Sequence, residues 1–237
     1  MNAALSTHGR QAALALLAAM AATLALYWVP ILKPLAWPLL MLSTLAHELG
    51  HGLTALLLGG RFQSLTIWAD GSGVAAYRAA FGPGSRALVA AGGLLGPPLA
   101  AFLLCLAGRR SRSAHVALAV LAALFALVAL LWAGSAFTLG FCLVLAVLLA
   151  LLAWKASRAL SQAVCVFLAL QLGLFTFSRA DYLFTPVAQT GAGLMPSDVG
   201  QIAAASWLPY WVWGGLIASI TLALLALGVW RFARALV

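Results

Sequence analysis

Charged residues are scarce in this chain. Only 7% of its 237 residues are Asp, Glu, Lys or Arg, whereas 65% are hydrophobic, and the mean hydropathy is +1.09. Soluble domains carry about 25% charged residues, so the composition excludes a soluble protein. Apolar runs of about 20 residues, the length that a helix needs to cross a bilayer, recur along the sequence. The sequence therefore predicts an integral, multi-pass membrane protein.

Cysteine and acidic residues are also few. The three cysteines lie inside apolar runs at wide spacing, which indicates neither a disulfide framework nor a C-x-x-C metal site. Four acidic residues stand against 13 Lys and Arg, giving a net charge of +9. In a soluble protein this excess would suggest nucleic acid, but here the basic residues fall between apolar runs. We therefore expect contacts with membrane lipid headgroups and no nucleic-acid partner.

The apolar runs divide into about seven candidate transmembrane helices. One long run is split in two at Gly134-Ser135. No soluble domain of any size fits between the runs, so we expect a single all-α polytopic membrane domain over residues 1–237. The candidate spans are about 12–30, 35–58, 84–107, 114–133, 135–154, 159–177 and 207–230.

The segment of residues 61–80, between the second and third runs, does not follow a helical pattern. Phe62–Trp68 and Val74–Tyr77 are rich in β-forming residues and flank the turn residues Asp70–Gly73. This predicts a small membrane-associated β-hairpin; an ordinary interfacial loop is the alternative. An unpaired strand edge can bind an extended peptide as an extra strand. We expect that edge to bind substrate through Thr66, Ile67 and Val74.

Residues 178–206 form the one long polar stretch. Within it, Pro196-Ser197-Asp198 is typical of a helix start, with Ser197 as the N-cap. We expect a short helix from this point to Ser206.

The second apolar run contains the sequence HELGH, with His47, Glu48 and His51. Residues four apart share one face of a helix, so the two histidines can bind one metal ion. Glu48 can reach a water molecule on that ion, which is the H-E-x-x-H arrangement of zinc hydrolases with Glu as general base. Burying three ionisable groups among apolar runs is unfavourable unless they are satisfied, which argues against a chance occurrence.

A catalytic zinc usually has three protein ligands and an open position, so a third ligand is needed. Counting crossings places His115 on the opposite side of the membrane, and His8 lies in a tail. Asp70 has a local role in a turn. Asp198, at the start of the predicted short helix, is the first choice, although an acidic residue there also suits a helix N-terminus; Asp181 is the second choice.

Three functions remain open on these residues alone. They are a zinc endopeptidase acting in the membrane, a metal-binding scaffold without catalysis, and a small transporter with the His and Glu side chains in its ion path. The intact Glu48 argues against the scaffold. The other apolar runs have no matching row of ionisable groups, which argues against the transporter.

Several further motifs follow HELGH in order. They are Gly59-Gly60-Arg61, Asp70–Val74, Gly96-Pro97, and Ser197-Asp198 with Ala203, Pro209 and Trp213. This ordered set resembles the site-2 protease family of intramembrane zinc metallopeptidases, and is closest to its compact bacterial B-type branch.

The resemblance implies Zn²⁺ bound by His47 and His51, with Glu48 as catalytic base. Asp198 occupies the late Asp position of this branch. The implied substrates are transmembrane proteins or membrane-adjacent peptides, and the implied location is a bacterial cytoplasmic membrane. The chain lacks the N-x-x-P-x-P-x-L-D-G motif that supplies the third ligand in better-known members, and it has no PDZ-like insertion.

The orientation in the membrane stays open. The side with HELGH carries fewer Lys and Arg than the opposite side, so the positive-inside rule places the opposite side in the cytoplasm. The family resemblance implies the reverse.

Overall fold

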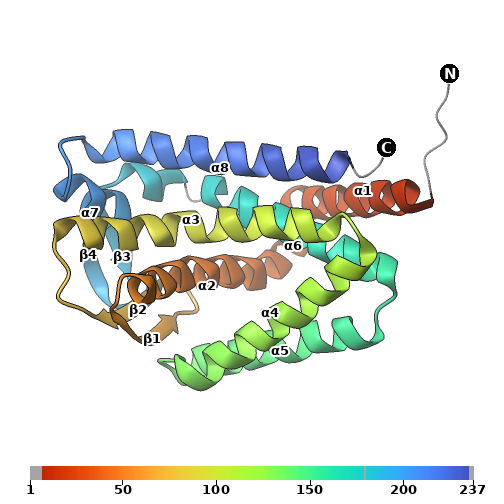
Figure 1. Ribbon diagram of the computed structural model, residues 1–237, viewed down its shortest axis with the longest axis horizontal. Coiled ribbons are helices and arrows are strands. Elements are labelled where there is room, and N and C mark those ends of the chain that lie inside the picture. Colours follow the sequence, from red (N-terminus) through yellow and green to blue (C-terminus); the bar gives the residue numbers. More distant parts are fainter. Residues whose placement is uncertain (1–6, 179, 235–237) are drawn as a thin grey trace.

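Helices dominate the computed structural model, which describes residues 7–178 and 180–234 (Figure 1). Within these ranges, each of the seven predicted runs coincides with a helix of 20 or more residues. These long helices are α1 (Thr7–Trp28), α2 (Lys33–Leu57), α3 (Pro83–Gly108), α4 (Ser111–Leu131), α5 (Ala136–Lys155), α6 (Arg158–Ser178) and α8 (Tyr210–Ala233). The shorter elements are η1 (Pro30–Leu32), β1 (Arg61–Ile67), β2 (Gly73–Arg78), η2 (Ala180–Phe184), β3 (Val187–Thr190), β4 (Gly193–Pro196) and α7 (Asp198–Ala204).

Among the described helices, five are long and apolar enough to cross a membrane: α3, α4, α5, α6 continued by η2, and α8. The predicted count of seven spans is not confirmed, because α1 and α2 are not among these five. In Figure 1, α1 and α2 follow each other along the long axis in the same direction, and α1 packs mainly against α6. Successive crossings must run in opposite directions, so these two helices do not form an antiparallel pair of spans in this arrangement.

Small residues bring α2 and α3 into close contact. A Cβ atom on Gly50 would lie 2.2 Å from the carbonyl oxygen of Gly92, and one on Gly96 would lie 2.6 Å from that of Ala46. Only residues without a side chain let two backbones approach so closely. The packing of α3 therefore fixes the position of the helix that carries HELGH.

Gly59 turns the chain from α2 into the first hairpin. Its φ of +83° lies in the left-handed region that glycine adopts without strain, as at many helix C-termini. β1 and β2 then pair in antiparallel fashion around the turn at Asp70-Gly71. The predicted β-hairpin is thus confirmed.

The polar stretch 178–206 has more regular structure than the sequence predicts. The short helix is present as α7, and Ser197 caps it by accepting a hydrogen bond from the backbone N–H of Gly200 at 3.0 Å. Before it, β3 and β4 form a second antiparallel hairpin that was not predicted. Strands of four residues are too short for a hydrophobic period to reveal them.

Both hairpins and α7 gather at one end of the molecule, at the left of Figure 1. Apolar contacts hold α7 there, since Val199 and Ile202 are buried against Leu94 of α3 and Ile217 of α8. The α3–α4 and α5–α6 turns and the end of α8 lie at the opposite end.

Candidate metal centre

α2 presents its two histidines on one face, as the four-residue spacing predicts. The rings of His47 and His51 meet edge to face with centroids 4.7 Å apart, and their Nε2 atoms are 3.1 Å apart. Two imidazole nitrogens are therefore directed at the same point in space.

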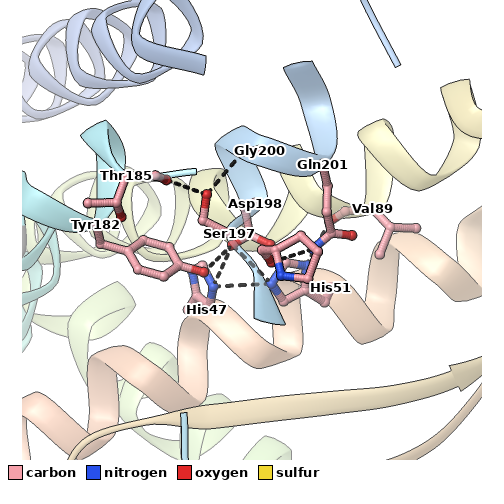
Figure 2. A network of polar contacts seen from close by, with 10 residues as sticks. His47, His51, Val89, Tyr182, Thr185, Ser197, Asp198, Gly200 and Gln201 are labelled. Carbon is pink, nitrogen blue, oxygen red and sulfur yellow. Dashed lines mark hydrogen bonds and ion pairs between the residues drawn. The ribbon is translucent and has the colours of Figure 1, made fainter. Parts of the chain in front are cut away.

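Asp198, the first residue of α7, points at both imidazoles (Figure 2). Its Oδ2 lies 3.0 Å from Nε2 of His47 and 3.4 Å from Nε2 of His51. The carboxyl group is buried, which by itself raises its pKa, but the neighbouring imidazoles outweigh burial and hold the pKa of Asp198 below its usual range. Asp198 is thus an anionic ligand candidate.

Ser197 fixes the direction from which Asp198 enters the site. Its hydroxyl donates a hydrogen bond to the backbone carbonyl of Thr185, and its backbone N–H donates to the carbonyl of Pro186 at 3.0 Å. Together with the cap on Gly200, these bonds tie the start of α7 to the segment that follows η2.

The spacing of the three donor atoms fits a zinc ion. The two Nε2 atoms and the Asp198 oxygen form a triangle with sides of 3.1, 3.0 and 3.4 Å. Ligand atoms about 2 Å from a tetrahedral zinc ion lie about 3.3 Å from one another. Two imidazoles and one carboxylate are also a common donor set of catalytic zinc.

A hydrogen bond from α3 sets the tautomer of His51. Its Nδ1 lies 2.8 Å from the backbone carbonyl of Val89. A carbonyl oxygen only accepts, so Nδ1 carries a proton and Nε2 is the nitrogen that can offer a lone pair to a metal ion.

Glu48 lies beside this triangle and is 5% exposed. One of its oxygens and the nitrogens of His47 and His51 all lie within 4.8 Å of one another. The backbone N–H of Ala75 on β2 also interacts with the Glu48 carboxylate. Asp198 supplies the third donor atom of the triangle, so the Glu48 carboxylate is not needed as a ligand. It can accept or donate a proton beside the triangle.

Tyr182, in η2, contacts the site but was not singled out from the sequence. Its hydroxyl donates a hydrogen bond to Oδ2 of Asp198 at 3.1 Å, and its ring meets that of His47 edge to face, with centroids 6.0 Å apart (Figure 2). Nothing in the sequence distinguishes this tyrosine from those that lie at membrane interfaces.

Two adjoining cavities open at the site, with volumes of about 150 and 320 Å³. Both have His47, Glu48 and Tyr182 in their walls. β2 lines one side and the β3–β4 hairpin lines the other, so the two cavities form a groove between two strands. We call this space the strand groove.

The outer edge of β1 is occupied. The backbone N–H of Leu65 donates to the carbonyl of Trp132 at 2.6 Å, and its carbonyl accepts from Gly134 at 2.8 Å. The α4–α5 turn therefore occupies the position of a further strand. Leu65 is paired with Ala75. The backbone N–H and C=O of Leu65 point away from β2, and in an antiparallel pair of this kind the N–H and C=O of the partner point away as well. The backbone groups of Ala75 therefore face outward from β2, whose residues line the groove.

The predicted substrate-binding residues divide accordingly. Val74 lines the strand groove, whereas Thr66 and Ile67 line neither cavity. The backbone N–H of Ile67 instead donates to Oγ1 of Thr138 in α5 at 3.0 Å. The hairpin edge at the candidate site is thus that of β2, not of β1.

The other candidate ligands lie elsewhere. Oδ1 of Asp70 accepts hydrogen bonds from the backbone N–H and the hydroxyl of Ser72, at 2.9 and 2.7 Å, as a turn residue does. His115 lies in α4, with Nδ1 3.2 Å from the hydroxyl of Ser161. The side chains of His8 and Asp181 lie outside the described part of the chain.

Comparison with known proteins gives one family. The model of a family described as Peptidase M50B-like matches residues 16–228, which include both histidines, Glu48 and Asp198. No curated protein and no solved structure matches the chain.

Proposed function

Since the chain belongs to the Peptidase M50B-like family, within the site-2 proteases, we propose that it is an intramembrane zinc metalloendopeptidase. The observation that carries this proposal is the triangle of His47, His51 and Asp198 with Glu48 beside it at the wall of the strand groove. In this proposal the three residues of the triangle hold Zn²⁺, and the cytoplasmic membrane of a bacterium is the location.

The chain's own groups then carry the proton transfers. Zinc, when bound, supplies a Lewis acid that polarises the scissile carbonyl and acidifies water. Glu48 takes a proton from the attacking water on a carboxylate oxygen and passes it to the nitrogen of the leaving amine. The bond from His51 to Val89 and the bond from Tyr182 to Asp198 hold the ligands in place.

The strand groove favours an extended substrate. A transmembrane helix keeps its carbonyls in internal hydrogen bonds and is about 10 Å across, so it has to unwind before a base and a metal can reach a peptide bond. The outward backbone carbonyl of Ala75 can accept a hydrogen bond from the unwound segment as an added strand, next to the Ala75 N–H that interacts with the Glu48 carboxylate. Val74 then lies beside the substrate, while Thr66 and Ile67 support β2 from behind.

The test separates metal binding from chemistry. Wild type, Glu48→Gln and His47→Ala are purified in detergent, and zinc per chain is measured together with cleavage of a reconstituted single-span protein. We expect about one zinc per chain in wild type and Glu48→Gln, and loss of zinc in His47→Ala. Cleavage should be lost in both variants, and by a factor of about 10² to 10⁴ in Glu48→Gln.

Two results would count against the proposal. Wild type without stoichiometric zinc, under conditions that keep zinc in a control metalloprotease, removes the metal centre. A Glu48→Gln variant with full zinc and unchanged cleavage removes the assigned base.

A further inference from the structure

The turns of the two hairpins meet, although 119 residues separate them in the sequence. The backbone N–H of Gly191, in the β3–β4 turn, donates a hydrogen bond to Oγ of Ser72 at 3.0 Å. The ring of Trp68 lies directly against the same glycine, since a Cβ atom on Gly191 would lie 2.4 Å from ring atom Cδ2. We call this contact of Gly191 with Ser72 and Trp68 the latch.

Asp70 holds the Ser72 hydroxyl in the direction that the latch needs. The hydroxyl donates its proton to Oδ1 of Asp70 at 2.7 Å, and the backbone N–H of Ser72 donates to the same oxygen at 2.9 Å. A hydroxyl has one proton and two lone pairs. With its proton directed at Asp70, the Ser72 oxygen presents a lone pair to the N–H of Gly191. The aspartate in the first turn, which is not a donor atom of the metal triangle, therefore helps to join the two hairpins.

The β3–β4 hairpin is held at its base and at the latch. At the base, the hydrogen bonds of Ser197 join it to the start of α7. Its turn is closed internally, because Oγ1 of Thr190 donates to the carbonyl of Gly193 at 3.0 Å. Most residues of the two strands are exposed, and segments with few buried apolar contacts are the ones that open locally. The hairpin can therefore turn as a unit about its base when the latch opens.

The latch lies at one end of the strand groove. Ser72 and Gly73 line the larger cavity together with Val187–Thr190 of β3. β2 begins at Gly73, directly after Ser72, so a strand that pairs along β2 beside Glu48 meets the latch at that end. An internal segment of an intact protein has chain on both sides of the bond to be cut. It cannot be threaded end first beneath a closed hairpin and has to enter the groove sideways.

We propose that the β3–β4 hairpin is a lid over the metal centre, held shut by the latch, and that it has to open there before an internal segment of a polypeptide can lie along β2. Lids of this kind control access to a site and exclude water while they are shut. Ser72, Trp68 and Gly191 then act on access to the site and not on the chemistry. The part that the lid plays for substrate rests on the proposed function, whereas its opening does not.

Opening of the lid can be measured without zinc or substrate. Val74→Cys places a thiol in the strand groove, and its rate of reaction with a bulky maleimide in detergent reports how often the lid is open. The native cysteines are buried, and the protein without the new cysteine measures their background. Three further changes are each added to Val74→Cys. Ser72→Ala removes the hydrogen bond of the latch, and Gly191→Ala places a methyl group against Trp68. Ser64→Ala, on β1, is the matched control, because Ser64 lines neither cavity.

We expect Ser72→Ala to raise the labelling rate by about 2- to 10-fold, the factor by which the loss of one hydrogen bond shifts an opening equilibrium. Gly191→Ala should raise the rate at least as much, since it pushes the turn away from Trp68, and Ser64→Ala should leave it unchanged. An unchanged rate in both latch variants, or an equal rise in the control, overturns the lid.

Locking the lid tests its role for substrate. Ser72→Cys is combined with Ala192→Cys, which lies next to Gly191 in the exposed turn, and a short bis-methanethiosulfonate joins the two thiols until a reductant removes it. We expect the crosslinked protein to keep its zinc, to lose most of its cleavage of a reconstituted single-span protein, and to regain cleavage on reduction. Ser72→Cys alone, treated in the same way, should keep cleaving.

Full cleavage by the crosslinked protein overturns the lid as the entrance for substrate. Absence of cleavage in wild type is a different result, because it removes the proposed function and leaves the labelling rates to decide whether the lid opens.

Discussion

The ring of His51 lies directly against the backbone of Gly93. A methyl group at Gly93 would lie 2.1 Å from Cε1 of the imidazole, far inside contact distance. α3 could make room only by giving up its backbone contacts with α2 at Gly92 and Gly96, on either side of this position. The bare backbone at this one position therefore lets His51 reach the metal centre.

We expect Gly93→Ala to push His51 out of line and to weaken zinc binding by about 10-fold or more. Gly84→Ala, in the same helix, is the control, since a Cβ there meets nothing within 4 Å. Competition with a chelator measures zinc affinity in both. Equal affinities in the two variants would show that His51 tolerates the displacement.

Asp198→Asn keeps the shape of the side chain but removes its charge. An amide is a poor zinc ligand and no longer pairs with the two imidazoles, so we expect zinc to be lost or its affinity to fall by about 100-fold or more. Asp70→Asn removes the same charge in the turn next to Ser72, and we expect it to keep its zinc. Zinc per chain after gel filtration distinguishes the two. Loss of zinc in Asp70→Asn but not in Asp198→Asn would show that Asp198 is not the third ligand.

Tyr182→Phe deletes the hydrogen bond to Asp198 and leaves the ring against His47 in place. Partners of metal ligands contribute about 10- to 100-fold in metal affinity or activity, and we expect a loss in that range. Tyr210→Phe is the control, because Tyr210 lines neither cavity. Zinc affinity is measured by chelator competition and turnover by cleavage. Unchanged zinc affinity and unchanged turnover would show that the hydroxyl of Tyr182 does not support the metal centre.

A photo-crosslinking amino acid at Val74 tests which strand edge meets substrate. Val74 lines the strand groove and Thr66, its partner on β1, does not. In the Glu48→Gln background, which keeps substrate uncut, we expect crosslinks to a single-span substrate from position 74 and not from position 66. Crosslinks from position 66 alone would place the substrate on the β1 side.

His47 and His51 can be placed from the sequence because helix geometry alone brings residues four apart together. Asp198 can be ranked by elimination, since the chain has only four acidic residues. The 3.0 Å approach of Asp198 cannot be predicted in this way, because it depends on how Val199 and Ile202 anchor α7 between α3 and α8. Local pattern thus identifies candidates, and tertiary packing decides among them.

The first hairpin also combines features that the sequence predicts with features that depend on tertiary packing. Its two strands and turn follow from residue types, but the covering of β1 does not, because it joins Leu65 to a turn between two helices far along the chain. For that reason Thr66 and Ile67 looked equivalent to Val74 in the sequence. The collinear arrangement of α1 and α2 is equally invisible there, since hydropathy reports length and not direction.

The contact between Leu65 and the α4–α5 turn also affects how copies of the chain behave toward one another. An exposed strand edge is a template for pairing with a second molecule, and proteins blunt such edges to avoid aggregation. Here one edge of the hairpin is bonded to the turn, and the other faces inward beside Glu48. The hairpin can therefore keep a reactive edge for a polypeptide that enters the groove without offering that edge to its neighbours in a crowded membrane.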